Sequence, residues 1–380
     1  MTNNQSKYPL LPFSQLVYDS TRWFPDVYTI FNIRLRVYGI SCLQACEILR
    51  VVLSNHPVFR LRLDRNGKQY EDPTADLLKG PYHHIKMQEK EEYLLVDVGM
   101  SRILGDDRSL QVLIEDVIRA YNGLPLEADD YWEYVARYEQ RKSEPHYSIS
   151  HDWLINEFSD ESIPVRPTID RWCLWTIIPP KVGLHTADYT DLHKKLQKIV
   201  EEKHLSMDGI FSLCAALAIA EYCGTDEAAL TWAYEGRETL EEQRLFGSLH
   251  RDVPFQINHK SQIINHKSDL IRIARNQIRS GIAHSDYPYT LTEPYNKRWN
   301  YAVNVLRVSD IKEMLAQAPL PVEIVSIPEQ KYAYALLDVE IHEHVDSLQL
   351  VYRYSATHYK PESIERFAAL VRKYVEWLID

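Results

Sequence analysis

The chain has few glycines, an odd number of cysteines and no recognisable metal motif. Only 12 of its 380 residues are glycine, which argues against Gly-rich phosphate-binding loops. The five cysteines lack the paired C-x-x-C spacing of a metal site (Cys42, Cys46, Cys173, Cys214 and Cys223). No H-E-x-x-H motif or Cys/His cluster is present either, so the sequence predicts no metal site.

Long apolar runs and an excess of basic residues are also missing. No apolar run approaches the roughly 18–20 residues that span a bilayer, so no integral membrane segment is expected. The net charge of -11 repels a polyanion, and no basic stripe offsets it, so no nucleic-acid partner is expected. The first ten residues lack the charged-then-apolar pattern of a secretory signal. Together with the odd cysteine count, this indicates a reducing cytoplasm.

The remaining composition is that of a globular protein, with 45% hydrophobic and 26% charged residues. A chain of 380 residues is too long for one ordinary core and predicts two lobes of roughly 150–200 residues each. A polar, proline-containing stretch at residues 159–168 separates helical from strand-like sequence. We therefore expect an N-terminal lobe over residues 1–160 and a C-terminal lobe over residues 161–380. Mixed elements in each half indicate an α/β (α+β) fold with helices packed on sheets.

Hydrophobic periodicity predicts the first elements of the N-terminal half. Apolar residues at helical spacing, preceded by a capping box, predict a helix over residues 41–53. Period-two alternation predicts a strand over residues 58–63, with Arg60 and Arg62 on one face. In the second half, helices are expected near residues 190–203 and 207–222, followed by strands at residues 230–234 and 348–354 and a final helix.

A strand, a short polar loop and a helix are predicted around residue 100. The strand covers residues 93–98, the loop residues 99–108, and helical spacing holds over residues 110–121. Gly123 is expected to close that helix. Because this arrangement can hold a catalytic residue rigidly at the end of a sheet, the loop is the candidate site.

Six short segments then carry a family resemblance: residues 8–15, 55–62, 131–153, 233–237, 251–254 and 284–289. In this order and at compatible spacing, they resemble the landmark motifs of nonribosomal peptide synthetase condensation domains, which belong to the chloramphenicol-acetyltransferase-like superfamily. The likeness runs from about Tyr8 to the C-terminus. It implies two chloramphenicol-acetyltransferase-like lobes in a V-shaped arrangement, with a tunnel that admits carrier-bound phosphopantetheine thioesters.

The family's signature HHxxxDG aligns with residues 101–107, which read Ser-Arg-Ile-Leu-Gly-Asp-Asp. Ser101 and Arg102 replace the two histidines, Asp106 is kept, and Asp107 replaces the glycine. In the family, the second histidine is thought to orient or deprotonate the attacking amine. A guanidinium stays protonated near neutral pH and cannot accept that proton. Loss of a positioned base typically lowers a rate by roughly 10²–10⁴-fold.

Three motif positions keep a candidate role. Ser101 is a possible nucleophile if a base lies beside it, and Arg102 is a possible oxyanion-stabilising group. The resemblance implies that the aspartate is structural and pairs with an arginine, and buried charges are seldom left unpaired. The expected partner of Asp106 is one of three arginines: Arg60, Arg62 or Arg237.

Two functions from different classes follow from the resemblance. One branch of the family, the cytochrome P450-recruiting domain of glycopeptide synthetases, carries HRxxxDD and binds a partner instead of catalysing. By analogy, the first hypothesis is a catalytically silent condensation-like module of nonribosomal peptide or related natural-product biosynthesis, which binds a carrier protein or a tailoring enzyme. The second is an active acyltransferase that moves an acyl or peptidyl group from a carrier or coenzyme A thioester to an amine or hydroxyl. No bound cofactor is expected in either case, and phosphopantetheine or coenzyme A would enter as part of a substrate.

Overall fold

The computed structural model describes residues 6–21, 29–171, 180–258, 267–289, 302–327, 333 and 335–380. The chain divides into two compact units. The first segment of unit 1 ends at Ser143, whereas the sequence suggested a boundary after residue 160. Two later segments also belong to unit 1, and we call the first of them, residues 235–250, the return segment. Unit 1 comprises Met1–Ser143, Glu235–His250 and Ser309–Glu329, and unit 2 comprises Glu144–Tyr234, Arg251–Val308 and Gln330–Asp380.

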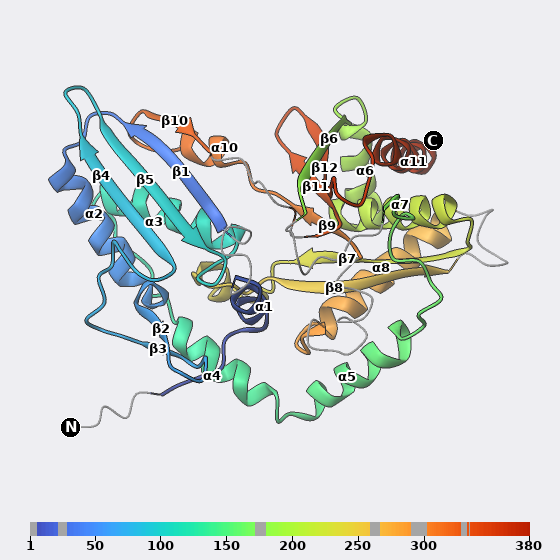
Figure 1. The fold of residues 1–380 in the computed structure, drawn as a ribbon, viewed down its shortest axis with the longest axis horizontal. Helices are drawn as coiled ribbons and strands as arrows, with labels where there is room; N and C mark the ends of the chain where they lie inside the picture. Colours follow the sequence, from blue (N-terminus) through green and yellow to red (C-terminus); the bar gives the residue numbers. More distant parts are fainter. Residues whose placement is uncertain are drawn as a thin grey trace. The chain divides into compact units, whose positions relative to one another are not determined.

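Unit 1 contains a four-stranded antiparallel sheet of order β10-β1-β5-β4, with helices on one of its faces (Figure 1). A short hairpin, β2-β3, lies outside this sheet. The described elements are α1 (Pro12–Thr21), β1 (Thr29–Val37), α2 (Cys42–Asn55), η1 (Pro57–Arg60), β2 (Leu61–Leu63), β3 (Gln69–Glu71), β4 (His83–Glu89), β5 (Leu94–Ser101), α3 (Asp107–Tyr121), α4 (Tyr131–Arg141), η2 (Glu242–Arg244), α10 (Ile311–Ala316) and β10 (Val322–Ser326).

The core of unit 1 lies between the sheet and the helices α2 and α3. Alternate residues of β5 are buried over its first half, as expected for a strand with one face on a core. Val52 and Leu53 of α2 belong to the same apolar cluster as Val96 and Val98 of β5. The predicted capping box starts α2: the Ser41 hydroxyl accepts from the N–H of Gln44. This helix therefore begins where its sequence predicted.

Unit 2 contains a six-stranded mixed sheet of order β6-β12-β11-β9-β7-β8. The pairs β11-β9 and β7-β9 are parallel, and the other pairs are antiparallel. The described elements are α5 (Pro145–Phe158), β6 (Val182–Asp188), α6 (His193–Lys203), α7 (Met207–Cys223), β7 (Glu227–Tyr234), β8 (Arg251–Asn258), α8 (Lys267–Ala283), β9 (Val303–Arg307), β11 (Leu337–Glu343), β12 (Leu348–Ser355) and α11 (Pro361–Ile379).

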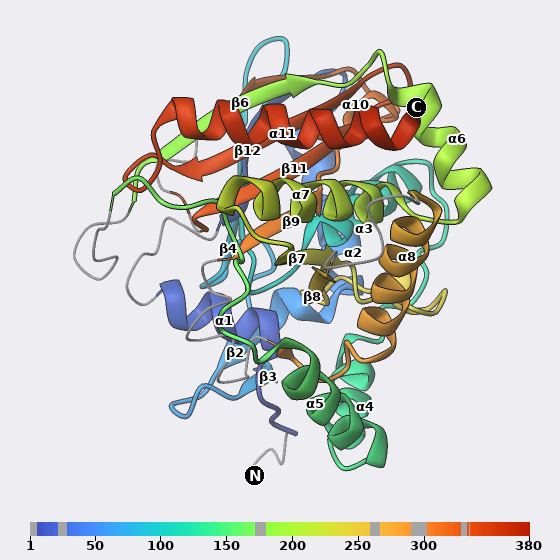
Figure 2. The same ribbon diagram turned by 90° about the vertical axis from the view of Figure 1, so that its right-hand side faces the viewer.

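The core of unit 2 is built around α7, which packs against α11, α8 and β7 (Figure 2). Nearly every residue of α7 from Met207 to Ala220 is buried, which explains why its sequence is apolar on all sides. Ser206 caps its start, and Gly224, with φ of +69°, ends it in the left-handed conformation that favours glycine. Within the described ranges, no single helix is long and apolar enough to cross a membrane, and α6 with α7 reaches that length only as a pair bent by 106°.

One predicted strand is partly a helical turn in the structure. Residues 58–63 were expected to form a single strand with Arg60 and Arg62 on a shared face. Instead, Pro57–Arg60 forms the 3-10 helix η1, and only Leu61–Leu63 is a strand. The fixed φ of proline suits the first position of a helical turn, and here that local preference prevails over the alternating pattern.

Candidate functional site

The motif loop connects β5 to α3 and is shorter than its sequence suggested. β5 continues to Ser101, which pairs with Thr29 of β1, so the loop is reduced to residues 102–106. A tight turn opens the loop, because the N–H of Leu104 donates to the carbonyl of Ser101 at 3.0 Å. Helix α3 starts directly after the loop, so both ends of the motif are held by regular structure.

Asp106 is the N-cap residue of α3 and is 6% exposed. Its Oδ1 accepts hydrogen bonds from the N–H and the hydroxyl of Ser109, at 3.0 and 2.9 Å. Its Oδ2 accepts from the backbone N–H groups of Leu249 and His250, at 2.9 and 3.1 Å. Both carboxylate oxygens are therefore occupied by structural contacts with the helix start and the return segment.

Arg237 supplies the counter-charge for Asp106. Its Nη1 donates to Oδ2 at 2.8 Å and its Nη2 to Oδ1 at 2.9 Å, which is the bidentate geometry of a strong charge-assisted pair. Burial alone would raise the pKa of Asp106, but the charge and hydrogen bonds of Arg237, aided by Ser109, hold that pKa below its usual value. Asp106 is therefore an ionised carboxylate that is held in a buried ion pair.

The other two expected arginine partners of Asp106 lie elsewhere. Arg60 pairs with Glu71 of β3, with its Nη2 2.6 Å from Oε1. The Nε of Arg62 lies 3.9 Å from Oδ2 of Asp72. Of the three candidates, Arg237 alone pairs with Asp106 among the ion pairs described for these residues.

Ser101 and Arg102 occupy the positions of the missing histidines. The Ser101 hydroxyl accepts from the N–H of Ile103 at 3.3 Å, and none of the described histidines or carboxylates hydrogen-bonds to it. The Nη2 of Arg102 lies 4.0 Å from Oδ1 of Asp107, a long contact between two partly exposed groups. The histidine positions of the motif therefore hold the hydroxyl of Ser101 and the guanidinium of Arg102. In the described part of the chain, no side-chain base is hydrogen-bonded to Ser101 to take its proton.

Helix α1 also contacts the motif loop, together with His250 of the return segment. The Ser14 hydroxyl donates to the carbonyl of Ile103 at 3.0 Å, and the Ile103 side chain packs with Phe13 in a small apolar cluster. The ring of Phe13 lies against the ring of His250, with centroids 4.6 Å apart. This cluster fixes the turn that carries Arg102.

Gly105 lies where no side chain fits. A Cβ at this position would lie 2.8 Å from Cε1 of Phe246 and 2.8 Å from Cβ of Ser109. We expect Gly105→Ala to lower the free energy of unfolding by about 1–3 kcal/mol, because the return segment or α3 must shift to make room. Urea denaturation followed by circular dichroism measures this change.

The control for this variant is Gly123→Ala, at the end of α3. Gly123 has φ of +68° and no atom within 4 Å of an added Cβ, so its substitution reports backbone strain without a clash. Unchanged stability of Gly105→Ala would show that the loop can adapt, against our expectation.

A second buried charge cluster in unit 1 was not predicted from the sequence. His56 is fully buried, and its Nδ1 lies 2.6 Å from Oδ2 of Asp129. The same Oδ2 accepts the N–H of Phe246 at 3.1 Å. The sequence signal was present only in part, because His56 lies in one of the family-like segments, whereas Asp129 follows 73 residues later.

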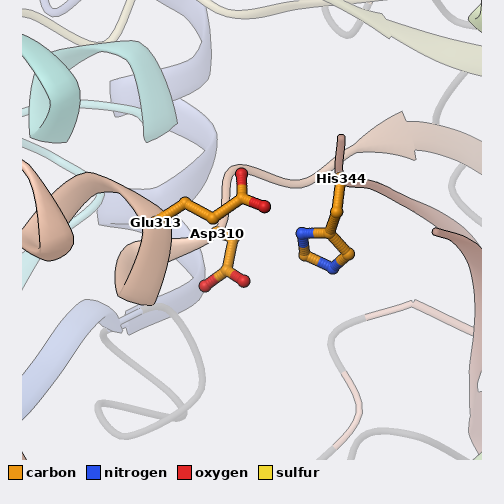
Figure 3. Close-up of side chains that lie close together, drawn as sticks. All are labelled: Asp310, Glu313 and His344. Atoms are coloured by element: carbon orange, nitrogen blue, oxygen red, sulfur yellow. The ribbon is translucent and has the colours of Figure 1, made fainter. Parts of the chain in front are cut away.

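Two acidic side chains at the start of α10 are drawn in Figure 3, together with His344 of unit 2. Asp310 is the N-cap residue of α10 and accepts from the N–H of Lys312 at 2.6 Å. Glu313 lies in the first turn of the helix. Because acidic groups at a helix N-terminus stabilise the helix, we interpret Asp310 and Glu313 as capping groups and assign no metal to them.

Solved structures of the same fold cover nearly the whole chain. The epimerization domain from the third module of tyrocidine synthetase B matches with a TM-score of 0.77 and 14% identity, over 99% of this chain and 97% of that one. The X-domain from teicoplanin biosynthesis matches with a TM-score of 0.76 and 16% identity, over 100% and 96%. The SgcC5 protein from Streptomyces globisporus matches with a TM-score of 0.76 and 12% identity, over 98% of each chain.

Sequence comparison gives the family. None of the curated proteins matches the chain in sequence. The family model described as Condensation domain matches residues 74–380, a range that contains the motif loop, Asp106 and Arg237. This match covers most of the chain and agrees with the shared fold, so the chain belongs to the condensation-domain family.

Proposed function

We propose that this chain is a condensation-domain-like protein of nonribosomal peptide or related natural-product biosynthesis that lacks ordinary amide-forming activity. The observation that carries the proposal is the bonding of the motif loop. Arg102 cannot take a proton from an amine near neutral pH, and Ser101 hydrogen-bonds to a backbone N–H and to no described histidine or carboxylate. Asp106, the remaining motif carboxylate, is fully occupied by Arg237, Ser109 and the return segment.

The retained role that we propose is binding, either of a carrier protein or of a tailoring enzyme. The motif loop has no proton acceptor at the histidine positions, yet Arg237 and Ser109 bind Asp106, and Ser14 binds Ile103. This arrangement fits a domain that is retained for binding a partner. The likeness to the X-domain from teicoplanin biosynthesis supports this class of function only by analogy, since it extends to the fold and not to a particular partner. We further propose that the protein acts in the cytoplasm, holds no resident cofactor and meets phosphopantetheine as part of a carrier.

A condensation assay tests the proposal. The protein is incubated with aminoacyl-loaded carrier proteins and amine acceptors, and amide product is measured by mass spectrometry. We expect wild type and Arg102→Ala to form no more product than a reaction without protein, while carrier binding by wild type remains measurable by calorimetry. The double variant Ser101→His with Arg102→His tests whether only the base is missing, since a restored base can raise the rate by roughly 10²–10⁴-fold.

Turnover by wild type that is lost in Arg102→Ala would contradict the proposal. It would favour the alternative, an active acyltransferase that uses a carrier or coenzyme A thioester. Apo and phosphopantetheine-loaded carrier proteins serve as matched ligands in the binding measurement. Absence of binding to both, together with absence of turnover, would point to a tailoring enzyme as the partner.

A further inference from the structure

The His56 ring lies between two carboxylates in the interior of unit 1. Its Nδ1 lies 2.6 Å from Oδ2 of Asp129, and its Nε2 lies 3.2 Å from Oδ2 of Asp116 on α3. The second contact has ion-pair distance but not hydrogen-bond alignment. The side chains of His56 and Asp129 are each 1% exposed, and that of Asp116 is 9% exposed. Solvent therefore screens these charges very little.

This geometry suits an imidazolium. A neutral ring has one N–H, and its other nitrogen would then turn a lone pair toward a carboxylate, whereas the charged ring has an N–H on each side and is attracted to both carboxylates. The charged groups that face the ring among the described residues are Asp116 of α3 and Asp129 ahead of α4. The neighbouring rings of Phe59 in η1 and Phe246 in the return segment are neutral.

Tyr131 of α4, the next titratable group along the chain, stays neutral because burial raises its pKa. Burial by itself would lower the pKa of His56, but Asp116 and Asp129 outweigh it, so the pKa of the ring is raised above its ordinary value. The electrostatic environment therefore favours the same charge state as the contact geometry.

Asp129 connects the charge of His56 to the return segment. Asp129 Oδ2, which His56 contacts, also accepts the N–H of Phe246 at 3.1 Å, and Asp129 Oδ1 accepts the N–H of Tyr131 at the start of α4. The same return segment carries Arg237, the partner of Asp106. A change at Asp129 is therefore expected to reach the segment that braces the motif loop.

We propose that His56 is a positioning residue: its protonated ring fixes Asp129 and, through Asp129, the return segment next to the motif loop, and deprotonation loosens this segment. A raised folded-state pKa means that the stabilising contribution is complete below the unfolded value of about 6.5 and is lost as pH rises through the folded value. The loosening therefore lies on the alkaline side. This inference does not rest on the proposed function, because it concerns the chain without substrate or partner.

The protonation state is tested directly on the wild-type protein. Ring ¹⁵N chemical shifts of His56, followed by NMR across pH 5 to 9, distinguish the imidazolium from the two neutral tautomers. We expect both ring nitrogens of His56 to be protonated at pH 7, where an ordinary exposed histidine is mostly neutral. A neutral His56 ring at pH 6 to 7 would overturn the proposal, whatever the fate of any variant.

The structural consequence is tested by amide hydrogen exchange in His56→Gln. We expect the variant-to-wild-type ratio of exchange rates at Phe246 to be roughly tenfold at pH 6, as for the loss of one hydrogen bond from a charged donor, and much smaller at pH 9. His83→Gln is the matched control. His83 is also buried in unit 1, but its Nε2 meets the neutral carbonyl of Leu77 at 2.9 Å, and burial lowers its pKa. An equal ratio at both pH values, or the same pH dependence in His83→Gln, would contradict the proposal.

Discussion

Replacing Arg237 with methionine should lower the free energy of unfolding by about 3–5 kcal/mol, because it strands a buried carboxylate without its counter-charge. Asp106 is 6% exposed, and Arg237 makes two hydrogen bonds to it. The guanidinium also donates to the carbonyl oxygens of Leu245 and Gly247, which would lose these donors. Urea denaturation monitored by intrinsic fluorescence measures the loss.

A double-mutant cycle separates the charge effect from lost packing. Adding Asp106→Asn to Arg237→Met removes the stranded charge, so the double variant should be less destabilised than the sum of the two single variants. Arg244→Ala is the matched control on the same return segment. Arg244 pairs with Glu127 at 2.5 Å, but both side chains are more than 40% exposed, so its loss should cost less than about 1 kcal/mol. Additive effects in the cycle would contradict a specific Asp106–Arg237 interaction.

Replacing Phe246 with alanine should lower the free energy of unfolding by about 3–5 kcal/mol. Phe246 is fully buried, and its ring lies against those of Phe59 and His56, at centroid distances of 4.9 and 5.4 Å. Its removal opens a cavity beside Gly105 and the His56 ring, which adds to the lost burial of the side chain. Thermal and urea denaturation both report this change.

Leu240→Ala is the control, because it truncates an exposed apolar side chain in the same return segment. Leu240 is 83% exposed, so its truncation should change stability by less than about 0.5 kcal/mol. A small effect of Phe246→Ala, comparable to that of Leu240→Ala, would mean that the return segment contributes little to the core of unit 1.

Local sequence patterns predicted the parts of the fold that depend on neighbouring residues. The capping box of α2, the strand β5 ahead of the motif loop and the Gly123 that ends α3 are each encoded within a few positions. The predicted strand over residues 58–63 was wrong at its first half, where Pro57 starts a helical turn. There, the alternating pattern and the local backbone preference gave opposite predictions.

The contacts of the site could be predicted only in part. The motif alignment identified Asp106 as a paired carboxylate, but three arginines remained possible, because Arg237 reaches it across 131 positions. His56 and Asp129 were missed as a pair, since neither residue type nor spacing indicates which distant carboxylate a buried histidine meets. Such contacts depend on how the elements pack, and the hydrophobic periodicity of the sequence does not indicate which elements pack together.

The return segment and β10 also determine when unit 1 can be completed during synthesis. The N-terminal 143 residues leave the ribosome without Arg237, without Phe246 and without the strand at Val322–Ser326 that pairs with β1. Until those residues emerge, the nascent unit has an unpaired sheet edge and an uncompensated Asp106. Domains generally fold as units during translation, yet the contacts within unit 1 can be complete only after most of unit 2 has been synthesised.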